Sequence, residues 1–255
     1  MAGPLLQVVD LCKHFGAIKA LDGIDIEIAR GSIHGIIGPN GSGKTTLFNC
    51  VTGLLKPTSG RVLLEGEDIT HQRPAQIAHR GVRRTFQAGK LVPGMTVIEN
   101  VMAGVNDRIG AATIDAAFRL PFVPSRRESE IREMAEGSLR LVGMDGSAER
   151  WAADLVWTER QLVQIARALV AEPKLLLLDE PGSGMGHRET QKVEEIIRSV
   201  RDRGITVVVV SHDVKMLMNL SDTFTVLNFG SKIAEGVPTV IRSDPRVLEA
   251  YLGAE

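Results

Sequence analysis

Residues 38–46 read Gly38-Pro39-Asn40-Gly41-Ser42-Gly43-Lys44-Thr45-Thr46, a complete G-x-x-x-x-G-K-[ST] loop. The loop follows an apolar run, Ile33–Ile37, and precedes a segment with helical character, Lys44–Val51. Backbone N–H groups of such a loop form a concavity for phosphates, and glycines allow close approach because they lack a Cβ. The simpler alternative is a glycine-rich turn before an ordinary helix. The motif in this context predicts a nucleoside triphosphate site.

Two side chains of this loop have predicted roles of their own. Lys44 is placed to reach the terminal phosphates, and Thr45 is placed to hold Mg²⁺. The positive end of the following helix adds favourable potential for an anion. We therefore predict ATP and Mg²⁺ as the ligands, with all nine residues of the loop as candidates for nucleotide binding.

A second candidate element lies far along the chain, where the apolar run Leu175–Leu178 leads into Asp179, Glu180 and Pro181. A short run that is apolar throughout is typical of a buried parallel strand. Ligands of open α/β sheets bind at the carboxyl ends of such strands. Asp179 is the predicted partner of Mg²⁺, and Glu180 is placed to polarise a water for attack on the γ-phosphate. Either acid alone would more simply be a solvated strand end.

Composition limits the classes of partner. The chain has 255 residues, 44% hydrophobic and 24% charged, which is an ordinary globular balance for one large domain or two small ones. A general nucleic-acid binder should carry a basic excess. The formal net charge of -1 therefore predicts no nucleic-acid partner.

Cysteine usage and hydropathy bear on location. The 2 cysteines, Cys12 and Cys50, are not spaced as a metal-binding cluster, which predicts two reduced thiols in a reducing cytosol. Met1–Asp10 has no signal-peptide pattern, and no apolar stretch approaches the roughly 20 residues that span a bilayer. If the protein works at a membrane, we expect it to be peripheral and to dock at the cytoplasmic face onto a protein that spans.

Alternating strand and helix patterns predict an α/β fold with a mainly parallel sheet, and the loop at 38–46 makes this a P-loop ATPase core. Alternation of isoleucines over residues 24–28 predicts an N-terminal antiparallel β part. Residues 88–154 instead show broken helical periodicity and several prolines. We assign residues 1–255 to one ATPase domain, in which 1–87 and 155–255 form the nucleotide-binding core and 88–154 an inserted helical subdomain.

The ordered set of loop 38–46, Gln87, Leu175–Glu180 and His212 resembles the ATP-binding subunit of an ABC transporter over almost the whole chain. Two further segments are similar to the branched-chain amino acid importer subfamily. They are Arg84-Thr85-Phe86-Gln87 followed by residues 93–101, and the ending Ile233–Gly236 with Glu249–Gly253.

The resemblance implies roles for three more residues. Phe15 would stack on adenine, although a core phenylalanine is the simpler interpretation. Gln87 would sense Mg²⁺ or the attacking water and couple the site to the membrane subunit. His212 would contact the γ-phosphate. We expect the remaining histidines to be structural or solvent-facing: His14, His34, His71, His79 and His187.

One family motif is altered. In the family, ATP lies between two subunits, and the second supplies a Leu-Ser-Gly-Gly-Gln-type signature at a helix start. Here the corresponding residues are Leu155-Val156-Trp157-Thr158-Glu159. Val156 lacks the serine hydroxyl, and Glu159 adds a negative charge. Thr158 with Gln161 also fits a capping box, so the helix is predicted to satisfy its own N–H groups.

The resemblance and this departure together predict an ATPase that couples hydrolysis to import of branched-chain or other amino acids. The predicted partners are two permease subunits, a different homologous ATPase in a heterodimer with one degenerate site, and indirectly a solute-binding protein. Alternatives are import of urea or another small polar or carboxylate solute, or a soluble ABC ATPase outside transport. Two equally active sites remain the alternative to asymmetry.

Overall fold

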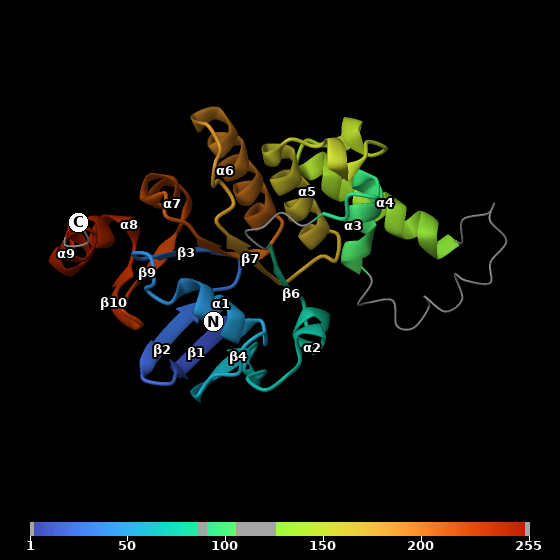
Figure 1. The fold of residues 1–255 in the computed structure, drawn as a ribbon. Coiled ribbons are helices and arrows are strands. Elements are labelled where there is room, and N and C mark those ends of the chain that lie inside the picture. Colours follow the sequence, from blue (N-terminus) through green and yellow to red (C-terminus); the bar gives the residue numbers. More distant parts are fainter. Residues whose placement is uncertain (1–2, 86–90, 106–125, 253–255) are drawn as a thin grey trace. The chain divides into compact units, whose positions relative to one another are not determined.

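The computed structural model describes residues 3–85, 91–105 and 126–252 (Figure 1). Residue contacts divide the chain into two compact units, residues 1–84 with 174–255, and residues 85–173. No helix within the described ranges is both long and apolar enough to cross a membrane.

An antiparallel sheet begins the first unit. Its strands are β1 (Leu6–Phe15), β2 (Ile18–Ile28), β4 (Ser59–Leu64) and β5 (Glu67–Asp68), in the order β2-β1-β4-β5. Burial of Ile24, Ile26 and Ile28 explains the alternation seen in the sequence and confirms the predicted antiparallel strand. β1 was not predicted, because its burial pattern is irregular and its pairing with β2 shifts register.

The second sheet of this unit is mainly parallel, as predicted. Its strands are β3 (Ile33–Ile37), β6 (Val82–Arg84), β7 (Leu175–Asp179), β8 (Thr206–Val210), β9 (Thr223–Asn228) and β10 (Ser231–Gly236). The order is β10-β9-β3-β8-β7-β6, and only the β9–β10 pair among these described strands is antiparallel. Every residue of β3, β7 and β8 is buried, which is why these segments are mostly apolar.

Helix α1 (Lys44–Val51) contributes to the core between the two sheets. Its Leu47, Phe48 and Val51 belong to one buried cluster with residues of β1 and β2 on one side and of β7 and β8 on the other. The other helices of this unit are α2 (Pro74–His79), α6 (His187–Asp202), α7 (Val214–Leu220), α8 (Pro238–Ser243) and α9 (Pro245–Leu252).

The second unit is helical where it is described. It contains α3 (Val97–Met102), α4 (Arg126–Leu141) and α5 (Trp157–Leu169), with short 3₁₀ turns η1 (Ala103–Val105), η3 (Asp145–Ser147) and η4 (Ala152–Asp154). All three helices pack against one another. The division therefore differs from the predicted subdomain 88–154, because the apolar face of α5 packs on α3 and α4 and brings residues 155–173 into this unit.

His34 is a polar residue within the parallel sheet. It is 1% exposed on β3, and its ring nitrogens lie 2.9 Å from the hydroxyls of Thr223 and Thr225 on β9. Burial, with a smaller contribution from the charge of Lys232, lowers the pKa of His34 from 6.5 to about 4. This histidine is therefore neutral and structural.

The buried imidazole predicts a pH dependence of stability. Between pH 6.5 and about 4 the unfolded chain binds a proton at His34 and the folded chain does not, so stability falls as the pH falls. At 1.36 kcal/mol per pKa unit, the loss is about 3 kcal/mol. Urea unfolding at pH 6.5 and 4.5 should show a smaller loss for His34→Gln than for the parent protein. The exposed control His71→Gln should match the parent, and equal losses in all three proteins would contradict the assignment.

Candidate nucleotide-binding site

Glycines shape the loop between β3 and α1. At Gly43 the backbone has φ 107°, and a Cβ there would lie 2.5 Å from the carbonyl oxygen of Ala20 on β2. A side chain at Gly38 would lie even nearer to backbone, 2.1 Å from the carbonyl oxygen of Leu227. Both positions therefore require glycine, and the loop is held as a tight turn at the N-terminus of α1.

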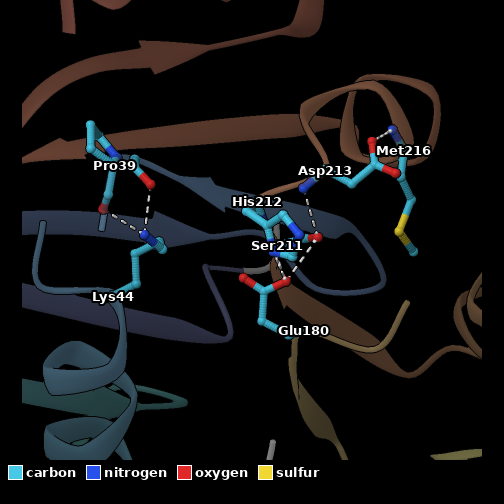
Figure 2. A network of polar contacts seen from close by, with 8 residues as sticks. Pro39, Lys44, Glu180, Ser211, His212, Asp213 and Met216 are labelled. Carbon is cyan, nitrogen blue, oxygen red and sulfur yellow. Dashed lines mark hydrogen bonds and ion pairs between the residues drawn. The ribbon is translucent and has the colours of Figure 1, made fainter. Parts of the chain in front are cut away.

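Lys44 folds back over this loop, as Figure 2 shows. Its Nζ donates to the carbonyl oxygens of Gly38 (2.6 Å) and Pro39 (2.9 Å), and lies 3.4 Å from Oγ of Ser42. Burial lowers the pKa of Lys44, and the negative charges of Glu180 and Asp179 oppose that shift. The ammonium is thus held at the loop by neutral carbonyl groups, which an anionic ligand would outcompete.

Asp179 ends β7 in a buried ion pair. Its Oδ2 accepts a 2.8 Å hydrogen bond from Nη2 of Arg84, with side chains 4% and 5% exposed. Nη1 of Arg84 donates to Oδ1 of Asn49 (2.6 Å), and the guanidinium lies 5.3 Å from the ring centre of Phe48. Arg84 on β6 therefore ties the carboxylate at the end of β7 to helix α1.

Glu180 follows directly and adopts a left-handed backbone conformation, φ 54°, which is uncommon for a residue with a side chain. Its Oε2 accepts from Nδ1 of His212 (2.7 Å), Oγ of Ser211 (3.2 Å) and the backbone N–H of His212 (3.3 Å) (Figure 2). Oε1 has no protein partner among the residues the structure describes. Because an ionised carboxylate only accepts, Nδ1 of His212 carries a proton.

Thr45 and Phe15 are exposed, as ligand-contacting residues should be. Thr45 lies in the first turn of α1, and Phe15 at the end of β1 is 48% exposed with Nζ of Lys13 5.0 Å from its ring centre. The simpler interpretation of Phe15 as a core residue is wrong. Gln87 lies outside the described residues. The oxygen donors at Thr45 and Asp179 suit Mg²⁺, which prefers hard oxygen ligands.

The altered signature begins α5 in the second unit. The helix starts at Trp157 with Val156, not Thr158, as its N-cap, and Oε2 of Glu159 accepts from the backbone N–H of Val156 (3.1 Å). The predicted capping box of Thr158 and Gln161 is therefore wrong in register. Both carboxylate oxygens of Glu159 also accept from Arg150, at 2.6 and 3.1 Å, and these hydrogen bonds hold the pKa of Glu159 below its usual value.

Sequence reasoning missed several residues of this site. Arg84 was noted only within a subfamily motif, and neither Asn49 nor Ser211 was assigned a role. Tyr251 of α9 lies beside the Gly38 backbone, where burial raises its pKa to about 12. Asn49 lies on α1 next to the loop, but Arg84, Ser211 and Tyr251 come from β6, the turn after β8 and α9, and no spacing along the chain brings these three to the loop.

Comparison with known proteins agrees with this arrangement. A model of the ABC transporter family matches residues 21–183, and a model of the branched-chain amino acid ATP-binding cassette transporter matches residues 231–255. The high-affinity branched-chain amino acid transport ATP-binding protein LivG of Escherichia coli K12 is 37% identical over 99% of both chains. The chain belongs to the ABC transporter ATP-binding family. The predicted resemblance is thereby confirmed.

Other relatives of this family agree. A probable LivG of Methanocaldococcus jannaschii is 36% identical, covering 98% of this chain and 97% of the relative. The crystal structure of an ATP-binding cassette of an ABC transporter in its ADP conformation is 35% identical, with TM-score 0.86 over 98% of this chain and 99% of that one. The predicted fold is confirmed, and the chain is an ATPase of this family.

The ion pair of Arg84 predicts a large effect on stability. In Arg84→Met the carboxylate of Asp179 stays buried without its cation, and removal of one partner of such a pair costs about 3–5 kcal/mol. Urea unfolding measures this loss. The exposed control Arg61→Met should change stability by less than about 0.5 kcal/mol.

A double variant separates the ion pair from packing. Adding Asp179→Asn to Arg84→Met removes the uncompensated charge, so the double variant should be more stable than Arg84→Met alone. A double variant that is less stable than either single variant would show that the ion pair is not the cause.

Proposed function

We propose that the chain is the ATP-hydrolysing subunit of a transporter that imports branched-chain amino acids through separate permease subunits. The observation that carries the proposal is the hydrogen-bonded Glu180–His212 pair at the sheet edge where Lys44 closes the loop. The names of the relatives support the amino-acid substrate. In such a complex the protein would lie peripherally at the cytoplasmic face.

The loop and its lysine would bind the phosphates. The β- and γ-phosphates would be bound by backbone N–H groups of residues 38–46, and Lys44 would exchange its two carbonyl partners for phosphate oxygens. Phe15 would stack on adenine. Thr45 and Asp179 would hold Mg²⁺, with Gln87 as a further ligand, and the ion would neutralise charge on the phosphate oxygens.

Water activation falls to Glu180. Its Oε2 is fixed by Ser211 and His212, so the remaining oxygen, Oε1, is oriented to accept a proton from the attacking water. Nδ1 of His212 donates to Glu180, which leaves Nε2 for the γ-phosphate, to which it donates when the imidazole carries a proton on both nitrogens. The pair thereby holds the base and a phosphate contact in one hydrogen-bonded unit.

We further propose that this chain pairs with a different homologous ATPase and that the two ATP sites are unequal. In the family the signature helix of one subunit offers its N-terminal N–H groups to the partner's nucleotide. Here Glu159 already accepts from Val156, and Val156 has no hydroxyl. Arg150 forms an ion pair with Glu159, so Glu159 repels the triphosphate less than the sequence alone predicts. The inequality of the two sites therefore rests on the loss of hydrogen-bond donors to the nucleotide.

Glu180→Gln tests the catalytic base and the asymmetry together. In the reconstituted complex the variant should bind ATP normally and hydrolyse it about 10²–10⁴-fold more slowly at this site. Total ATPase activity should then fall below about a tenth, since the partner's site contributes little. The exposed control Glu195→Gln should keep full activity. Retention of half the activity would show two equal sites, and unchanged activity would remove Glu180 from the mechanism.

A gain-of-function variant tests the signature directly. Val156→Ser, Thr158→Gly and Glu159→Gln together rebuild Leu-Ser-Trp-Gly-Gln while retaining Trp157. In a complex that also carries Glu180→Gln, this change should raise ATPase activity several-fold, because each recovered hydrogen bond to a charged group contributes roughly 1.5–3 kcal/mol. No recovery, with the complex intact by size-exclusion chromatography, would contradict the asymmetry.

A further inference from the structure

Three side chains of kinds that bind metals gather on the β1–β2 hairpin of the first unit. Cys12 and His14 lie on β1, and Asp22 lies on β2. Sγ of Cys12, a ring nitrogen of His14 and a carboxylate oxygen of Asp22 all lie within 4.8 Å of one another. None of the three belongs to the residues that we assign to nucleotide binding.

Backbone geometry explains how they meet. Leu11 pairs with Ile24 and Lys13 pairs with Leu21, so one residue of β1, Cys12, opposes two residues of β2. The extra residue forms a β-bulge, in which Gly23 has φ 67°. Bulges redirect side chains, and this one brings Asp22 to the face that Cys12 and His14 share as alternate residues of β1.

The β1 backbone at these positions is fixed from its other edge. The carbonyl of Cys12 accepts from the N–H of Thr58 (2.7 Å), and the N–H of His14 donates to Oγ1 of Thr58 (2.9 Å). The two ligand-bearing residues of β1 are therefore held in place before any ion binds.

The donor atoms lack strong partners of their own. Nε2 of His14 is buried and has no hydrogen-bond partner within the described part of the chain. Sγ of Cys12 makes two weak contacts, accepting from the backbone N–H of Gly23 (3.2 Å) and donating to the carbonyl oxygen of Asp10 (3.7 Å). Asp22 pairs with Lys19 (3.1 Å), but both side chains are exposed, at 40% and 60%, so that pair is readily exchanged.

We propose that Cys12, His14 and Asp22 bind one Zn²⁺ ion. Thiolate, imidazole and carboxylate are all zinc ligands, and a water would complete a tetrahedral site. Zinc bond lengths of about 2.0–2.3 Å require ligand atoms roughly 3.3–3.8 Å apart. The three donor atoms lie within 4.8 Å of one another, so small side-chain rotations bring them to that spacing. The ion would cross-link β1 and β2 next to Phe15.

Cobalt substitution tests this site in the full-length, nucleotide-free, reduced protein. One equivalent of Co²⁺ should produce a thiolate-to-cobalt charge-transfer band, and Zn²⁺ should displace it with a one-to-one endpoint. Co²⁺ bound to oxygen ligands at the phosphate loop gives no such band. The matched control is Cys50→Ala, since Cys50 is 1% exposed and burial raises its pKa to about 11.

Variants assign the ligands. Cys12→Ala should lose the band, and His14→Gln should bind Zn²⁺ at least tenfold more weakly in competition with a chelating dye. Asp22→Asn, at an exposed position, keeps the fold and should weaken Zn²⁺ several-fold. Cys50→Ala should behave as the parent protein. A parent protein without the band, a band that depends on Cys50, or unchanged zinc affinity in Asp22→Asn would overturn the proposal.

Discussion

Parallel pairing of three strands underlies the whole site. β8 lies between β3 and β7, and its last residue, Val210, pairs with Ile36 on one side and Asp179 on the other. Because the pairing is in parallel register, the three strands end at the same edge. The phosphate loop, the acidic pair and the Ser211–His212 turn therefore leave the sheet together, although they are far apart in the sequence.

That edge brings three charged side chains close together. Asp179 and Glu180 are buried and Lys44 is partly buried, so each charge needs a partner. Arg84 forms an ion pair with Asp179, and the Ser211–His212 turn donates hydrogen bonds to Glu180. The loop carbonyls accept hydrogen bonds from Lys44. Each partner also fixes the orientation of the charged group that it contacts. The contacts that stabilise the charges are therefore the same contacts that orient these groups for catalysis.

The sequence predicted the parts of this fold that local rules determine. The bounds of β3 and α1 follow from an apolar run and a helical segment, and the phosphate loop between them follows from a motif of consecutive residues. The capping of α5 was mispredicted because Thr158 with Gln161 fits the sequence pattern of a capping box, whereas the helix begins at Trp157 and its N-cap, Val156, has no side chain that can cap. Contacts made only by tertiary folding were beyond prediction. Arg84 contacts Asp179 because β6 and β7 are neighbours in the sheet. The two residues are 95 positions apart, and no sequence pattern predicts a contact over that separation.

The proposed zinc ligands are a second case in which the sequence does not show contacts made by tertiary folding. Along the chain, Cys12 and Cys50 are not spaced as a metal-binding cluster, and the sequence predicted His14, two residues from Cys12, to be structural or solvent-facing. The β-bulge is what brings Asp22 across, and a bulge is a property of the pairing between two strands, not of either strand. A sequence motif predicts a site when the ligand is bound by backbone atoms of consecutive residues, as at residues 38–46. It fails where a site is assembled from side chains of different strands, and there the register of the sheet is the information that matters.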